Sequence, residues 1–199
     1  SKHRSESGLK TLTVHPIGYF ATAELGGRDG KLVPPAPHLM TSALRILSRE
    51  AKNLNYKISF EATHHGPYLG TPSFFIEIGS DESAWNDKKA GESIARTILK
   101  ITEKKHRENP VAVGIGGGHY APRFTELALA KQIDFAHMVP NYQINALSDE
   151  MIDKIVACAN PNFVYFHRKA MKNEDYRRLE KSFELRGIKS VREKDLEPL

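Results

Sequence analysis

Cysteine is nearly absent from this chain of 199 residues, which contains Cys158 alone. A single thiol cannot form an internal disulfide, and this composition is typical of proteins in a reducing, intracellular compartment. Long apolar runs are missing as well, because no stretch approaches the ~20 consecutive apolar residues that span a bilayer. Residues 1–12 (SKHRSESGLKTL) lack the apolar core of a signal peptide. We therefore expect a soluble, cytoplasmic protein that makes no membrane contact.

The overall composition is that of an ordinary globular protein, with 40% hydrophobic and 27% charged residues. A chain of this length buries about 70% of the surface that its unfolded form exposes, which is enough for a sizeable core. We expect a single α/β catalytic domain over residues 1–199. The 29 lysines and arginines exceed the 24 acidic residues, and the net charge of +5 weakly favours a polyanionic partner such as a nucleic acid.

Strand-like and helix-like segments alternate along most of the chain, which predicts βαβ units. The expected fold class is α/β, with three α/β/α layers around a mixed, mostly parallel sheet. Strands are expected at residues 11–15, 56–63, 73–78, 111–115, 134–139, 163–166 and 188–191. Helices are expected to open at residues 34–37 and continue through Leu47, and to lie at 86–106, at 122–131, at 149–159 with Ser148 as N-cap, and after a second N-cap at Asn173. The turn at residues 66–67 predicts that the strands at 56–63 and 73–78 are neighbours.

Five of the nine histidines lie at or near the ends of predicted strands: His15, His64, His65, His119 and His137. Parallel α/β sheets bind ligands at the carboxyl ends of their strands, so these histidines are candidate site residues. Neighbouring side chains on a strand point to opposite faces, and His64 and His65 can share a site only where the backbone leaves the extended form. If either joins His15 and His119, three imidazoles could hold a zinc-like ion with an open position for water. A metal-free histidine that acts as general base explains the same residues.

A glycine-rich stretch, Gly114-Ile115-Gly116-Gly117-Gly118, ends the predicted strand at 111–115 and continues beyond it. Residues without Cβ let backbone amides approach a phosphate or an oxyanion closely. The stretch is not a dinucleotide-binding fingerprint, because His119 stands where that pattern has its third glycine, and the Gly-Lys-Ser/Thr of a phosphate-binding loop is missing. The alternative is a tight turn that serves packing alone.

Nucleophilic hydrolases are not indicated by the sequence. Cys158 shares a helical stripe with Met151 and Ile155, which favours core packing over catalysis. No Gly-x-Ser-x-Gly elbow occurs. A candidate track for phosphate groups is formed by Lys88, Lys89, Lys104, Lys105 and Arg107.

Several longer strings point to one family. They are Lys2-His3-Arg4-Ser5-Glu6-Ser7-Gly8, Leu12-Thr13-Val14-His15-Pro16, Thr63-His64-His65-Gly66-Pro67 and Gly116-Gly117-Gly118-His119-Tyr120-Ala121-Pro122-Arg123. Together these strings resemble the archaeal and plant type of D-aminoacyl-tRNA deacylase, and the resemblance covers nearly the whole chain. It implies hydrolysis of the ester between a D-amino acid and the 3′-terminal adenosine of tRNA, with zinc as cofactor and tRNA as partner. It also implies a fold similar to peptidyl-tRNA hydrolases and phosphorylase-hydrolase-like proteins. Because family members carry a strand and a helix before the Ser-Lys-His-Arg string, we expect this amino-terminal segment to be missing here.

The resemblance and the residue chemistry together define the expected site. The expected catalytic residues are His64, His65, His119 and Glu77. The expected metal ligands are His15, His64 and His119. Substrate contacts are expected from Gly116, Gly117, Gly118, Tyr120, Arg4 and Thr63. The neighbouring 2′-hydroxyl of the terminal ribose could instead do the proton work, and a monomer is expected.

Three other functions remain open on the sequence alone. A metal-dependent peptidase or amidase would use the same histidines, and a nucleoside or phosphate-ester enzyme would use the glycine-rich stretch. A non-catalytic tRNA-binding module would need only the positive charge, but the chain lacks the clustered aromatic residues expected of a base-stacking surface.

Overall fold

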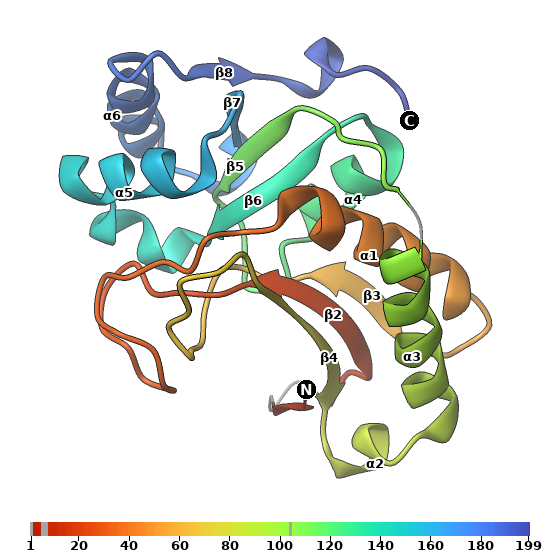
Figure 1. Cartoon of the computed structure of the whole chain (residues 1–199). Helices are drawn as coiled ribbons and strands as arrows, with labels where there is room; N and C mark the ends of the chain where they lie inside the picture. Colours follow the sequence, from red (N-terminus) through yellow and green to blue (C-terminus); the bar gives the residue numbers. More distant parts are fainter. Residues whose placement is uncertain (1, 5–7, 104) are drawn as a thin grey trace.

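The chain builds two four-stranded β-sheets with helices packed against them, as a computed structural model shows (Figure 1). The structure describes residues 2–4, 8–103 and 105–199, and for residues 2–4 it describes the backbone only. One sheet is mixed and the other is parallel. The predicted α/β class with mixed and parallel strands is therefore confirmed, although the strands are divided between two sheets instead of forming one.

The first sheet has the strand order β1-β4-β2-β3. Its strands are β1 (Lys2–Arg4), β2 (Thr11–Pro16), β3 (Lys57–Phe60) and β4 (Phe74–Ser80). β2 runs parallel to β3 and antiparallel to β4. The prediction that the strands at 56–63 and 73–78 are neighbours is wrong, because β2 lies between them and pairs with both. Residues 61–73 are long enough to cross β2, so the turn at 66–67 does not close a hairpin.

Helices and short 3₁₀ segments follow most strands. The α-helices are α1 (Pro37–Glu50), α2 (Glu82–Trp85), α3 (Lys88–Glu103), α4 (Pro122–Ala130), α5 (Asp149–Ala159) and α6 (Asn173–Glu184). The 3₁₀ segments are η1 (Asn141–Ala146), η2 (Arg168–Ala170) and η3 (Glu193–Asp195). In the part of the chain that the structure describes, no helix has the length and apolar character needed to cross a membrane.

The ends of the helices confirm some of the predicted helix caps and bounds and correct others. Ser148 accepts the backbone N–H of Met151 and caps α5 as predicted. Asn173 is not a cap, because Lys172 occupies that position and Asn173 is the first residue of α6. The helix predicted at 86–106 is observed as α3, which begins where the carboxylate of Asp87 accepts backbone N–H groups of its first turn. The short helix α2 lies before the predicted range and was not predicted.

The two faces of the first sheet differ in polarity. Leu12 and Phe60 point to one face, where they are fully buried in a core shared with α1. On the other face Thr13 lies between Ser59 of β3 and Glu77 of β4, which are its partners in register. All three polar side chains are at most 1% exposed. A half-buried sheet normally turns its polar face to water, so a buried polar face marks this sheet as the support of a site.

The second sheet has the order β6-β5-β7-β8, with all strands parallel. Its strands are β5 (Val111–Ile115), β6 (Asp134–Val139), β7 (Phe163–Phe166) and β8 (Lys189–Val191). Ala112 packs with Phe124 and Leu127 of α4 on one face, whereas Val113 packs in a second cluster with residues of α5 and α6. The helices therefore cover both faces, as Figure 1 shows, and the predicted bounds of β5, β6 and β7 are confirmed.

The carboxyl ends of the two sheets are joined directly. The backbone N–H of Thr63 donates to the carbonyl of Met138 at the end of β6 (2.8 Å), and that of Ala62 donates to the carbonyl of His119 after β5 (2.7 Å). The segment that follows β3 is thereby fixed onto the ends of β5 and β6. Polar loops from both sheets gather at this junction, where a rigid scaffold holds them.

Candidate active site and metal centre

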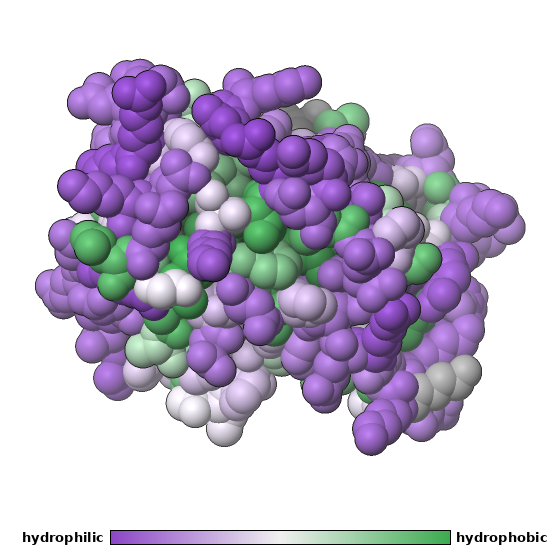
Figure 2. All heavy atoms as spheres, turned by 90° about the horizontal axis from the view of Figure 1, so that it is seen from above, coloured by the Kyte–Doolittle hydropathy of each residue, from purple (hydrophilic) through white to green (hydrophobic). Residues whose placement is uncertain are grey.

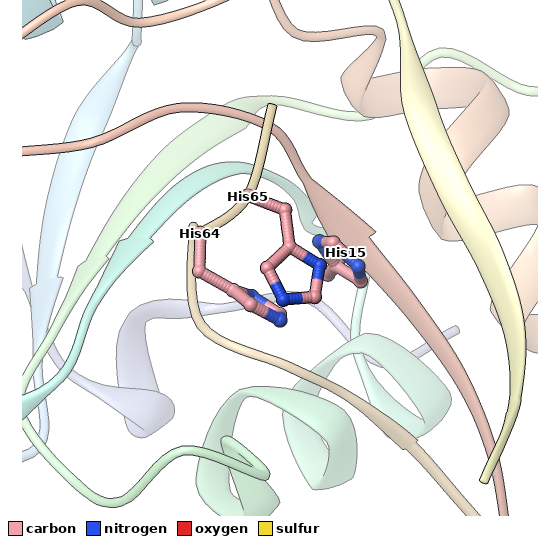
Figure 3. Close-up of side chains that lie close together, drawn as sticks. All are labelled: His15, His64 and His65. Atoms are coloured by element: carbon pink, nitrogen blue, oxygen red, sulfur yellow. The ribbon is translucent and has the colours of Figure 1, made fainter. Parts of the chain in front are cut away.

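Three histidines form the centre of the site at the carboxyl ends of β2 and β3. His15 lies on β2, while His64 and His65 lie in the segment after β3, and their rings converge (Figure 3). The rings of His15 and His64 stack with centroids 4.1 Å apart, and the His65 ring lies 4.0 Å from that of His64. His65 has a φ of 66°, so the backbone leaves the extended form at this residue. The two neighbouring histidines share one site because of this departure, as the sequence required.

The bend after His65 depends on the close approach of two glycine segments. The backbone N–H of Gly66 donates to the carbonyl of Leu25 (3.0 Å), and the N–H of Gly18 donates to the carbonyl of His65 (3.1 Å). A Cβ added at Gly66 would lie 2.1 Å from the backbone nitrogen of Gly27, a distance that no side chain can occupy. The loop before α1 therefore holds the two histidines in place.

Glu61 lies in the candidate site, and the sequence analysis did not predict it there. Its Oε2 lies 3.4 Å from Nε2 of His64 and 3.3 Å from Nε2 of His119, and its side chain is fully buried. The only signal for it in the sequence is its spacing, because it shares the polar phase of β3 with Ser59. That phase does not tell whether the face is buried or solvated.

Glu77 lies on the buried face of β4, and the prediction that places it in the site is consistent with this position. Its Oε1 is 3.6 Å from Nε2 of His15, and its side chain is 1% exposed. The side chain of Glu77 therefore does not point outward to solvent on its strand. Register with Thr13 turns the carboxylate to the same face as the histidine of β2.

Backbone carbonyls determine which nitrogen of two rings faces the carboxylates. Nδ1 of His15 lies 3.0 Å from the carbonyl oxygen of Pro16, and Nδ1 of His64 lies 2.7 Å from that of Ala62. A carbonyl oxygen only accepts hydrogen bonds, so we assign the N–H of each ring to Nδ1. The lone pair of each Nε2 then points toward the cluster, which is the arrangement that metal-binding histidines use.

The environment of His64 keeps its ring neutral. Burial lowers the pKa of His64, and the neighbouring His15, His65 and His119 lower it further. Nε2 of His64 and Oε2 of Glu61 are then two acceptors that face each other at 3.4 Å. A cation shared between them would stabilise this arrangement.

The donor set fits a zinc ion in chemistry and in spacing. Zinc binds nitrogen and oxygen ligands at about 2.0–2.1 Å in a tetrahedron, which separates the ligand atoms by about 3.3 Å. The two distances from Glu61 to the imidazoles of His64 and His119, 3.4 and 3.3 Å, are close to this separation. The donor atoms of these three residues all lie within 4.8 Å of one another.

The predicted ligands His15, His64 and His119 do not form one such group among the described residues. His64 belongs to two groups, one with Glu61 and His119 and the other with His15 and His65. A third group joins His15 to the carboxylates of β4 and of the segment after β3. The three predicted ligands therefore do not share one group of donors. His64 and His119 are joined by the carboxylate of Glu61, which the spacing in the sequence did not reveal.

The glycine-rich stretch combines a packing role with an open position. Gly116 and Gly117 have φ values of 103° and 87°, and a Cβ at Gly116 would lie 2.9 Å from the side chain of Met171. These two glycines are required by the backbone and by packing, as the tight-turn interpretation holds. Apart from Gly118 itself and its two chain neighbours, no described residue has an atom within 4 Å of the Cβ position of Gly118, so this part of the stretch lies open beside His119.

The other residues predicted to contact substrate lie in different places in the structure. Tyr120 lies beside the site, with its ring 5.4 Å from that of His119 and Nζ of Lys57 5.5 Å from its centre. Thr63 is buried, and its hydroxyl accepts the backbone N–H of Met138 (3.0 Å), so it holds the sheet junction together. The side chain of Arg4 lies outside the described part of the chain.

His137 does not join the cluster, although it lies near the end of β6. It is fully buried, its Nδ1 lies 3.2 Å from the hydroxyl of Thr63, and its Nε2 lies 3.9 Å from Sγ of Cys158. Burial lowers the pKa of His137 to about 4. Cys158 packs beside this core histidine, in agreement with its predicted packing role.

Tyr142 in η1 is a second residue that the sequence analysis missed. Its hydroxyl lies 3.3 Å from Nδ1 of His119. Burial of the hydroxyl and the nearby carboxylates of Glu61 and Glu24 raise its pKa, so it stays protonated near neutral pH. No pattern in the sequence links this tyrosine to a histidine in a different loop.

The predicted phosphate track lies away from the histidines. Lys88 and Lys89 begin α3, which packs on α1 in the apolar core of the first sheet, on the side opposite the polar face. Lys104 lies outside the described residues. These lysines therefore do not border the cluster, because the amphipathic helix that carries them covers the other side of the sheet.

The chain resembles known proteins along nearly its whole length. Residues 1–191 match the family profile of D-aminoacyl-tRNA deacylase. The chain belongs to this family. A D-aminoacyl-tRNA deacylase of Methanosarcina acetivorans is 42% identical over 200 residues, which cover 98% of this chain and 66% of the relative. A deacylase of the same name from Thermococcus onnurineus is 39% identical, over 97% of this chain and 72% of its own length.

The fold of the chain is also found in a solved structure. The crystal structure of a conserved protein of unknown function superposes with a TM-score of 0.92 at 33% identity, over 98% of this chain and 70% of the other. The resemblance read from the sequence strings is thereby confirmed. The chain spans about two thirds of the length of the Methanosarcina relative, 66%, and 40% of a relative from Methanococcoides burtonii.

Proposed function

We propose that this chain hydrolyses the ester bond between a D-amino acid and the 3′-terminal adenosine of tRNA. The family supports the substrate class. The observation that carries the proposal is the fully buried carboxylate of Glu61, placed between the imidazoles of His64 and His119 at the junction of the two sheets. Ionisable groups that are desolvated together in this way are typical of catalytic sites.

Zinc is the cofactor that we propose for this site. Glu61, His64 and His119 would hold it, with His15 packed against His64 and oriented by Glu77. When bound, zinc would supply a Lewis acid for the ester carbonyl and lower the pKa of a water toward 7. The neutral imidazole ring of His64, whose Nδ1 lies against the carbonyl of Ala62, supports this assignment, because zinc binds the deprotonated nitrogen.

The residues at the mouth of the cluster would orient the ester. His119 is 29% exposed, and its Nδ1 lies 3.3 Å from the hydroxyl of Tyr142. In the metal-free alternative, in which His119 is not a ligand, it would carry a proton to the departing 3′-oxygen. The open backbone at Gly118 lies next to it, where a peptide N–H can stabilise negative charge on the carbonyl oxygen. An aminoacyl ester is intrinsically labile, so orientation and charge stabilisation account for most of the rate. In the substrate-assisted route the 2′-hydroxyl of the ribose would take over the proton transfer.

The positive net charge of the chain, +5, supports tRNA as the partner. A protein that acts on charged tRNA works where translation takes place, and we propose the cytoplasm as its location.

The test is a deacylation assay on matched D-tyrosyl-tRNA and L-tyrosyl-tRNA, with and without chelator. The variant is His64→Ala, because His64 belongs to two of the possible metal groups. The matched control is His106→Ala, since His106 lies after α3 and contacts the carbonyl of Ile101 (2.7 Å), away from the cluster. We expect cleavage of the D-ester, little cleavage of the L-ester, and a loss of about 100-fold or more in kcat for His64→Ala.

Equal cleavage of both enantiomers, or full activity of His64→Ala, would contradict the proposal. Hydrolysis of a simple peptide or amide would favour a metal-dependent peptidase. Binding of tRNA without any cleavage would favour a binding module. If chelation leaves the rate unchanged, zinc is excluded while the deacylase assignment stands.

A further inference from the structure

A cleft of about 640 Å³ lies at the carboxyl ends of β7 and β8, between α4 and α6. Its size is within the range of small-molecule sites. Hydrophilic side chains dominate the side of the molecule on which β8 lies (Figure 2). None of the residues assigned above to the active site lines this cleft. It is therefore a second place at which the chain can bind a ligand.

The strand order places the cleft beside the usual ligand position of α/β sheets, because β7, which lines it, borders the divergence between β5 and β7. From β5 the chain passes through α4 to β6 on one side, whereas from β7 it passes through α6 to β8 on the other. The crevice outside the carboxyl ends of strands at such a divergence is the general ligand position of open α/β sheets. The loop after β7, including η2, forms one wall of the cleft.

His167 connects the cleft to the active site. It lines the cleft, and its Nδ1 lies 3.1 Å from the position that a Cβ on Gly117 would take. That nitrogen is buried and has no hydrogen-bond partner among the residues that the structure describes. Gly117 belongs to the stretch that ends in His119 of the proposed catalytic cluster. A ligand in the cleft would thus lie on the other side of the glycine-rich stretch from the ester.

A flat cationic platform forms the floor near α6. The guanidinium carbon of Arg168 lies 4.1 Å from the ring centre of Tyr176, so the two groups are in close cation–π contact. The Tyr176 hydroxyl donates to Glu180, which also accepts from the hydroxyl of Ser190 (2.6 Å). The guanidinium plane and the ring are surfaces on which a nucleobase stacks.

A fixed polar wall stands opposite this platform. Arg123 donates to Glu193 (2.6 Å), to Glu126 (3.2 Å) and to the hydroxyl of Tyr165 (3.1 Å). These bonds hold both donors and acceptors in place at the cleft. A bare phosphate needs donors alone, whereas the edge of a base presents donors and acceptors together and is matched by such a mixed wall.

We infer that this cleft binds one nucleotide of the single-stranded 3′ end of tRNA, adjacent to the terminal adenosine. The base stacks on the guanidinium of Arg168, which lies over the ring of Tyr176, its edge meets the carboxylates and guanidinium of the wall, and Lys169 at the rim takes the phosphate. The inference rests on the proposed function for the choice of an RNA strand as ligand. It adds a recognition site that lies outside the histidine cluster.

The test uses the full chain and a fluorescein-labelled RNA of sequence ACCA, with affinity measured by anisotropy. The variants are Arg168→Ala and Lys169→Ala, both at exposed positions, and the control is Lys52→Ala in the exposed turn after α1. We expect Arg168→Ala to weaken binding by about 5- to 100-fold, the range for loss of base stacking. Lys169→Ala should reduce the slope of log affinity against log salt by about 0.7, the value for one lost contact to single-stranded phosphate.

A second readout separates this inference from the proposed function. With D-tyrosyl-tRNA as substrate, Arg168→Ala should raise KM by the same factor and leave kcat unchanged, because the variant does not touch the reacting groups. If the chain binds ACCA through Arg168 but cleaves no ester, the inference stands and the proposed function fails. If the ester is cleaved and Arg168→Ala binds ACCA like the unmodified chain, the inference fails and the proposed function stands. Binding of CMP as tightly as ACCA would also overturn the inference, because the ligand would then be a free nucleotide.

Discussion

Zinc should raise the melting temperature of the native chain, because the donor atoms of the cluster already lie close together. The donor atoms of Glu61, His64 and His119 already lie within 4.8 Å of one another, so little rearrangement opposes binding. At free zinc 100 times the Kd, binding to the native state alone adds about 2.7 kcal/mol to the free energy of unfolding. In a chain of this size each kcal/mol raises Tm by about 2–4 °C, which gives an expected rise of about 5–11 °C.

The measurement is scanning calorimetry on chain treated with chelator and then titrated with zinc. His64→Gln removes a donor from two of the three possible groups, and its Tm should stay within about 1–2 °C of its metal-free value, since the remaining donors bind zinc weakly. His106→Gln is the matched control and should show the full rise. Magnesium at the same concentration should have no effect, because imidazole nitrogen suits zinc and magnesium prefers oxygen.

Two results would refute this reasoning. One is a Tm that does not respond to zinc in the unmodified chain. The other is an equal rise in His64→Gln, which would place the stabilising ion elsewhere. Either would remove the argument that the facing acceptor atoms of Glu61 and His64 are held for a cation.

Two further predictions concern positions that support the site. Gly66→Ala would place a Cβ 2.1 Å from the backbone of Gly27, so it should lower the free energy of unfolding in urea by about 1–3 kcal/mol and reduce activity, whereas Gly70→Ala, with open space around it, should do neither. His137 has a pKa of about 4 in the native chain, below the ordinary value of 6.5, so the unfolded chain takes up a proton first as the pH falls. Stability should therefore be intact above pH 6.5 and decrease by up to about 3 kcal/mol as the pH falls to 4. His137→Gln should remove this part of the acid sensitivity in pH-dependent urea unfolding, and an unchanged profile would contradict the assignment.

Elements of the second sheet could be predicted from the sequence because their signals are local. The apolar run of β5 lies between a proline and the glycine-rich stretch, and a fully buried parallel strand has such a continuous apolar pattern. Ser148 caps α5 by bonding to a residue three positions away. The start of α3 was placed too early because the sequence analysis did not recognise Asp87, whose carboxylate accepts backbone N–H groups of the first turn, and α2 was not predicted.

The order of the first sheet could not be read in this way. β2 pairs with β3 and β4, which lie more than 40 residues further along the chain, and alternation within each strand does not reveal its neighbours. The same non-local pairing determines that the polar phase of these strands is buried. Glu61 and Glu77 became members of the site for that reason, while the equally polar Lys57 remained exposed.

The sequence by itself determined the family, the α/β class and most of the imidazoles of the site, since these depend on residue identity and on short-range patterns. Only the tertiary structure decided which of those imidazoles meet, that Glu61 lies between two of them, and that His137 belongs to the core. The physical reason is that a carboxylate becomes a ligand or a catalyst through its distance to other groups and its loss of water. Both properties arise when separate strands pair, and the spacing of residues along one strand predicts neither of them.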